Sequence, residues 1–97
     1  MQPAITRVVK LTFEPDFAEN FKVIFKEHRA GIAHMQGSIS LQAYQDIHQP
    51  HVFFTISLWE NEAALDSYRF SSFFKSLWGK VKPRFTEKAV AHSMLPL

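Results

Sequence analysis

The spacing of hydrophobic residues in the first third of the chain predicts a strand followed by a helix. Over residues 5–13 every second residue is apolar except Arg7, and this period of two is typical of a strand with one buried face. Over residues 15–31 the apolar residues recur every three or four positions, with His28 on the same stripe, which predicts an amphipathic helix. Arg7 therefore interrupts an apolar face and is expected to be paired or to lie near the edge of the strand.

The middle of the chain predicts a β-hairpin. Over residues 38–45 polar residues alternate with the apolar residues Ile39, Leu41 and Ala43, which is the period of a strand. Residues 51–59 are almost continuously apolar, which indicates a strand that is buried on both faces. Pro50 belongs to the turn between the two strands, because proline has no backbone N–H for strand pairing.

Two helical stretches and a weak strand are expected in the last third. Asn61 can cap the first helical stretch, and Ser71 or Ser72 restarts or caps the second. Pro83 ends the second stretch, since proline breaks a helix interior. Residues 86–94 have weak strand character.

This order of elements predicts the fold class. The chain is expected to form one domain over residues 1–97, an α+β sandwich of the ferredoxin-like β-α-β-β-α-β type. Its four-stranded antiparallel sheet would carry both helical regions on one face. The first and third strands are apolar on their other face as well, so we expect that face to pack against a second copy, as a homodimer.

Composition limits the possible partners and cofactors. The 97 residues carry a formal net charge of +2, are 46% hydrophobic and include no Cys. A disulfide framework and a thiolate metal site are therefore excluded, and the five histidines match no metal-binding spacing. Between Arg69 and Lys88 basic residues alternate with aromatic ones, but the period directs the aromatic residues, Phe70 among them, to the core. We expect no nucleic-acid binding, no membrane span, no signal peptide and a cytoplasmic location.

The element order, Gly37 before the second strand, and the run from Ser57 to Trp78 resemble the antibiotic biosynthesis monooxygenase family of dimeric α+β barrel proteins. The resemblance implies one of two chemistries. Some members oxygenate quinols or polyketide phenols without flavin or metal, and others bind and degrade haem. The haem degraders carry an Asn on the first strand, a Trp at the end of the third strand and a His on the next helix. Trp59 matches the Trp, but Arg69 stands near the His position and the first strand has no Asn.

Seven residues are candidates for a site between the sheet and the helices. Trp59 and Arg69 are the predicted catalytic residues, Trp59 as a wall against a flat ring and Arg69 as the cation for a phenolate or carboxylate. Core or dimer packing of Trp59 and a solvated position for Arg69 remain open alternatives. The predicted substrate-binding residues are Arg7, Tyr68, Phe73, Trp78 and His34, with His34 at the mouth of the pocket. No metal and no cofactor is expected.

Two functions from different classes follow. The first is a cofactor-independent monooxygenase acting on a quinol or another electron-rich aromatic molecule. The second is a non-catalytic dimeric module that binds a small apolar ligand. Haem binding or degradation ranks below both, because two of the three positions that the resemblance requires are absent.

Overall fold

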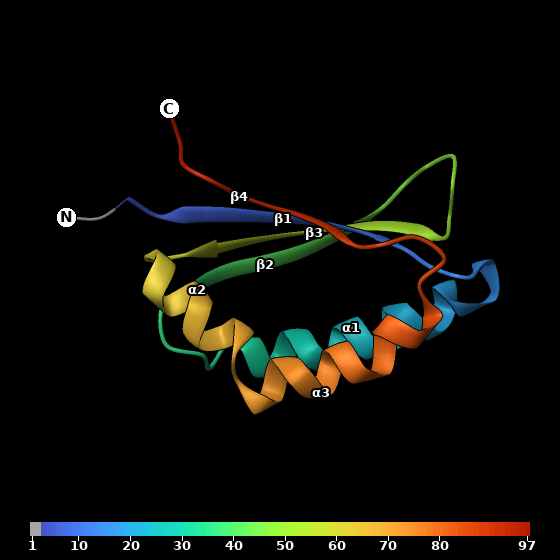
Figure 1. The fold of residues 1–97 in the computed structure, drawn as a ribbon, viewed down its shortest axis with the longest axis horizontal. Helices are drawn as coiled ribbons and strands as arrows, with labels where there is room; N and C mark the ends of the chain where they lie inside the picture. The colour runs from blue at the N-terminus through green and yellow to red at the C-terminus, as the bar shows by residue number, and fades with distance from the viewer. Residues whose placement is uncertain (1–2) are drawn as a thin grey trace.

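The computed structural model describes residues 3–97 and contains one four-stranded antiparallel sheet with its helices on a single face (Figure 1). The strands occur in the order β2-β3-β1-β4. The α+β fold and the predicted element order are confirmed. The elements are β1 (Ile5–Thr12), α1 (Ala18–Ile32), β2 (Ser38–Gln45), β3 (Val52–Trp59), α2 (Glu62–Arg69), α3 (Ser72–Val81) and β4 (Val90–Met94), with short 3-10 turns η1 (Pro15–Phe17) and η2 (Lys82–Arg84).

The start of the first helix differs from the prediction, because no side chain caps it. The turn at Pro15 is a 3-10 turn and α1 begins three residues later, at Ala18, with no side chain capping either start. Asn61 does cap α2, because its Oδ1 accepts a hydrogen bond from the Ala64 amide at 2.8 Å. Ser71 caps α3 in the same way, accepting from the Phe74 amide at 3.1 Å.

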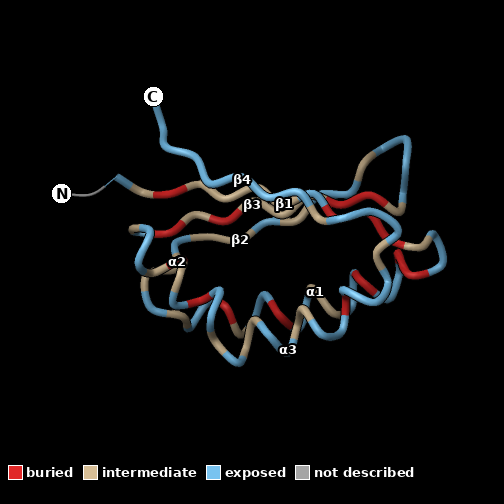
Figure 2. Tube along the Cα trace, in the orientation of Figure 1, coloured by how far each residue is buried: buried red, intermediate tan, exposed pale blue. Residues whose placement is uncertain are grey.

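The core lies on the helix-facing side of the sheet, in two clusters. Figure 2 shows buried segments on β1, β3 and the inner side of α1. At one end Phe13 is fully buried, and its ring contacts those of Phe17, Phe21, Phe53 and Phe85. At the other end Trp59 and Leu65 are buried with Ile5, Ile32 and Tyr68. The ten Phe residues of the sequence thus serve mainly as core.

We call the opposite side of the sheet the open face, because no helix of residues 3–97 covers it (Figure 1). Its centre is apolar and only partly buried, and consists of Val8 on β1 and Phe54, Ile56 and Leu58 on β3. At its margins Tyr44, Val90 and Met94 are 55%, 48% and 43% exposed.

Two apolar side chains were predicted on the wrong side. Ile39 does not share the buried face of Leu41, because the β2–β3 register shifts between Ser38 and Ser40, and Ile39 is 52% exposed. Phe70 is 70% exposed instead of buried. It follows the last residue of α2, where the helical period that was used to place it has ended.

Two glycines allow a matched test of this packing. Gly37 has a φ of +82°, and a Cβ there would collide with the Cβ of Ala64. We expect Gly37→Ala to lower the free energy of unfolding by about 2–4 kcal/mol, from backbone strain and overpacking. Gly79, in α3, has nothing within 4 Å of a built Cβ, so Gly79→Ala should raise the free energy by about 0.5–1 kcal/mol. Urea denaturation measures both, and equal effects of the two substitutions would contradict the packing described.

Candidate functional site

A cavity of about 350 Å³ lies between the helix-facing side of the sheet and the three helices. Most of its wall is apolar, which is usual for small-molecule sites. The apolar wall consists of Val9, Leu11, Phe21, Phe25, Ile32, Leu41, Leu65, Phe70, Phe74, Leu77, Trp78, Val81, Ala89 and Ala91. Six polar residues complete it: Arg7, His28, Thr55, Ser57, Tyr68 and Arg69.

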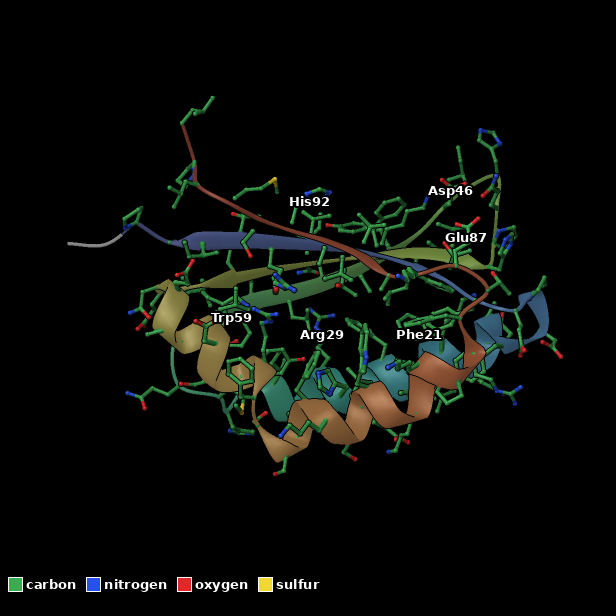
Figure 3. All side chains as sticks on the ribbon, viewed as in Figure 1. Phe21, Arg29, Asp46, Trp59, Glu87 and His92 are labelled. Carbon is green, nitrogen blue, oxygen red and sulfur yellow. The ribbon has the colours of Figure 1, made fainter. Side chains whose placement is uncertain are left out.

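A column of stacked rings supports one end of this cavity. The Trp59 ring lies on the Tyr68 ring with 4.9 Å between centroids, and the His28 ring lies on the Phe73 ring at 4.5 Å. Figure 3 shows Trp59 between the sheet and the helices. Its indole Nε1 donates to Ser57 Oγ at 3.1 Å, because residues two apart on a strand face the same side. The column joins β3, α2, α1 and α3.

Gly31 makes room for one member of that column. A Cβ at Gly31 would lie 2.5 Å from Cζ of Phe73. The missing side chain therefore lets α3 approach α1 closely enough for Phe73 to stack on His28.

A buried hydrogen bond links the column across the helices. His28 Nε2 and the Tyr68 hydroxyl are 2.6 Å apart. Burial, with a smaller contribution from the positive charge of Lys80, lowers the pKa of His28 from 6.5 to about 4. Burial raises the pKa of Tyr68. Both groups are consequently uncharged at neutral pH, and the pair presents a fixed polar contact to the cavity.

The charge of the cavity comes from two arginines. Arg7 reaches it from β1, where its Nη1 donates to Ser93 Oγ on β4 at 2.9 Å. Arg69 reaches it from the end of α2 and lies 3.5 Å from the Asp66 carboxylate. Burial and the positive charge of Arg69 lower the pKa of Arg7, so the two guanidinium groups are close enough to repel each other.

The structure brings four of the seven predicted site residues to the cavity wall: Arg7, Tyr68, Arg69 and Trp78. Trp59 and Phe73 lie behind the wall, where they support Tyr68 and His28. Trp59 has no exposed surface. His34 was predicted at the mouth of the pocket, but it lies on the exposed turn after α1, outside the cavity lining. Ile32 is the last residue of α1 that lines the cavity, and His34 lies in the turn that follows it.

Neither a metal cluster nor a membrane span was identified in the part of the chain that the structure describes. No three His, Asp or Glu side chains among residues 3–97 are grouped so as to hold a metal ion. The helices within the same residues are too short or too polar to cross a bilayer.

Comparison with known proteins places the chain in a family. Residues 4–77 match the sequence model of the family described as Antibiotic biosynthesis monooxygenase. The chain belongs to this family. The matched residues include β1 to α2 and the larger part of α3, and with them Arg7, His28, Tyr68 and Arg69. No protein of curated function matches this member of the antibiotic biosynthesis monooxygenase family.

Solved structures share the fold of this family member at low sequence identity. A conserved protein from Methanosarcina mazei Go1 is 20% identical, with a TM-score of 0.92 over 99% of this chain and 95% of that one. The protein PA3566 from Pseudomonas aeruginosa is 21% identical, with a TM-score of 0.88 over 100% and 97%. A protein named antibiotic biosynthesis monooxygenase is 15% identical, with a TM-score of 0.89 over 96% and 98%. These likenesses establish the fold alone.

Sequence reasoning missed three polar groups that line the cavity of this family member: His28, Thr55 and Ser57. The helical period places His28 on the buried stripe of the first helix, and the sequence offers it a site role only as one of five histidines whose spacing matches no metal motif. Its signal was present: a titratable side chain on an apolar face needs a buried partner, here Tyr68. Thr55 and Ser57 lie in an almost continuously apolar strand, and two small hydroxyl side chains in such a strand do not by themselves indicate a site.

The depressed pKa of His28 predicts a pH-dependent stability. Between pH 4 and 6.5 the unfolded chain binds a proton at His28 that the folded chain does not, so stability rises with pH across this window. We expect the contribution of His28 to the free energy of unfolding to be about 2 kcal/mol smaller at pH 5 than at pH 8. Urea denaturation at the two pH values measures the difference.

The control for this prediction is His28→Gln, which keeps a side chain that can hydrogen-bond to Tyr68 and does not titrate. The free energy of unfolding differs between pH 5 and pH 8, and in the variant this difference should be about 2 kcal/mol smaller than in the wild type. An unchanged pH dependence in the variant would show that His28 is not the group responsible.

Proposed function

We propose that this chain is a cofactor-independent monooxygenase whose substrate is a quinol or another electron-rich aromatic molecule bound in the cavity. Membership of the antibiotic biosynthesis monooxygenase family supports the reaction class. The observation that carries the proposal is the pair of guanidinium groups that line a partly open cavity rich in aromatic side chains. Such a cavity removes much of a flat ring from water and supplies a cation where an anion forms.

The chemistry requires no electron source besides the substrate. Loss of a hydroxyl proton gives an anion, which transfers an electron to dioxygen, and the radical pair then joins at a ring carbon. One oxygen atom enters the substrate and the other leaves as water, and the substrate supplies all four electrons. The protein contributes orientation, exclusion of water and stabilisation of the anion.

Each site residue has a role in this proposal. Arg69 and Arg7 stabilise the anion by charge and hydrogen bonds. The Tyr68 hydroxyl, held by His28, contacts the substrate hydroxyl, and the Trp78 ring packs against the substrate ring. Trp59 and Phe73 act as positioning residues, because they contact Tyr68 and His28 from behind the wall.

One observation favours the alternative of a non-catalytic ligand-binding module. A general base works best with a pKa near the working pH, and the pKa of His28 is lowered to about 4. His28 is therefore a weak base at neutral pH, and deprotonation would rely on the two arginines to lower the pKa of the substrate. A protein that only binds would need no base.

Oxygen consumption distinguishes the two functions. Wild-type protein is mixed with a panel of reduced naphthoquinones and benzoquinols, and oxygen uptake above the spontaneous rate is recorded. We expect uptake, with Arg7→Gln lowering kcat/KM about 10- to 100-fold because the anion loses a cation. Arg29→Gln is the matched control, since Arg29 is exposed on α1 and is not among the residues that line this cavity. Absence of uptake by the wild type across the panel would favour the binding module.

We also propose that residues 1–97 form a single domain that pairs with a second copy through the open face. The support is the apolar centre of that face, which water would otherwise contact. The expected interface exceeds about 1,200 Å² in total.

Sedimentation equilibrium tests the homodimer. At micromolar concentration the wild type should have about twice its monomer mass of 11.2 kDa. Ile56→Lys, at the centre of the open face, should reduce the mass to that of the monomer, because a charge would be buried at the interface. Val23→Lys, an exposed position on α1, should leave the dimer intact. A wild-type monomer, or dissociation by both variants, would contradict the pairing.

A further inference from the structure

The strongest unexplained feature of the cavity is an excess of positive charge in an apolar wall. Arg7 and Arg69 both line it, and within residues 3–97 the lining includes no Asp or Glu. Asp66, beside Arg69 at 3.5 Å, offsets one of the two charges. His28 and Tyr68 are uncharged at neutral pH. The cavity is left with about one unit of positive charge.

Arg7 carries that charge with little compensation from the protein. It lies on the helix-facing side of β1, in line with Ile5, Val9 and Leu11, and is partly buried. A guanidinium group has five N–H donors, and the side-chain hydrogen bond that Arg7 makes is the one to the neutral Ser93 hydroxyl, at 2.9 Å. Within residues 3–97 no carboxylate lies within 4.0 Å of it.

The surroundings also act against the charge of Arg7. Burial and the neighbouring Arg69 both lower its pKa, and only Asp66 and Tyr68 oppose them. A partly buried cation is stabilised by an anion that accepts its free N–H donors. The protein supplies no such anion at Arg7 in the described residues, so a ligand that brings one would bind favourably.

We infer that the molecule bound in this cavity is an aromatic carboxylate, with its permanent negative charge held between Arg7 and Arg69 and its ring in the apolar space. Planar guanidinium groups match the two oxygens of a carboxylate. One net positive charge suits a monoanion better than a phosphate monoester, which is largely dianionic at neutral pH. The ring faces Phe74 and Trp78 rather than water.

This inference rests on the cavity being the substrate site of the proposed oxygenase, and it narrows the substrate class. A neutral quinol becomes anionic only when it loses a proton, whereas an aromatic hydroxy acid brings its carboxylate already charged. The carboxylate would anchor the molecule on the arginines and leave the ring hydroxyl free to react. The charge on the ligand would then contribute to binding before any chemistry occurs.

Equilibrium binding without oxygen tests the inference. The probes are 2-naphthoate and its uncharged counterpart 2-naphthamide, titrated into the intact protein by calorimetry at pH 7. We expect 2-naphthoate to bind about 10- to 100-fold more tightly, as charge-assisted hydrogen bonds would give. The difference should shrink as salt is raised, because exposed Arg69 is screened.

Variants assign the preference to the arginines. Arg7→Gln should remove most of the preference for 2-naphthoate, Arg7→Lys should keep part of it, and Arg29→Gln should keep all of it. Circular dichroism checks that each variant is folded. If Arg7→Gln does not fold, Arg7→Lys still tests the inference, because it keeps the charge but loses the planar guanidinium group. Equal affinity for the two probes, no binding of either, or a preference that survives Arg7→Gln would overturn the inference.

The result is separable from that of the oxygen-uptake experiment. A protein that consumes no oxygen with the quinols or with an aromatic hydroxy acid, but prefers 2-naphthoate, contradicts the proposed oxygenase and supports the carboxylate. A protein that oxygenates neutral quinols and binds both probes equally supports the proposed oxygenase and contradicts the carboxylate.

Discussion

The hydrogen bond between the Tyr68 hydroxyl and the His28 imidazole is the contact on which the site depends. It joins α2 to α1 in the interior, and the rings of Trp59 and Phe73 cover its two sides. Removing one partner would leave a buried polar group unsatisfied, which costs more than the bond itself contributes. The bond and the two flanking rings therefore connect three helices and β3 at this end of the cavity.

The interior is divided between solid packing and open space. Around Phe13 aromatic rings pack against one another between sheet and helices, and Phe13 has no exposed surface. Beyond Phe21 the layer opens into a cavity of about 350 Å³. A cavity that the protein's own side chains do not fill lowers stability relative to a packed core. The Phe13 cluster offsets that loss, so the fold tolerates a cavity that packing alone would not favour.

The two arginines that line the interior both lie at the cavity. Arg7 interrupts the apolar face of β1, and that position is unfavourable for the isolated protein, because burial and Arg69 both act against its charged form. Arg69, at the end of α2, adds a second cation at the more exposed side. The two positive charges become favourable only when an anion enters the cavity and pairs with them. Reaction and recognition would then use the same groups, since a cation that anchors a carboxylate also lowers the pKa of a nearby hydroxyl.

The sequence by itself determined the order of elements and the side of each element that faces the core. The alternation in β1 already placed Arg7 on the buried face, and the helical period placed His28 on the inner stripe of α1. Periodicity fails where the strand register shifts and where an element ends, so it misplaced Ile39, at the shift within β2, and Phe70, just after α2. Only the tertiary structure decided that His28 meets Tyr68, 40 residues away, and that Arg7 meets Arg69 at one cavity. Those meetings depend on how the helices pack across the sheet, which a pattern along one chain does not encode.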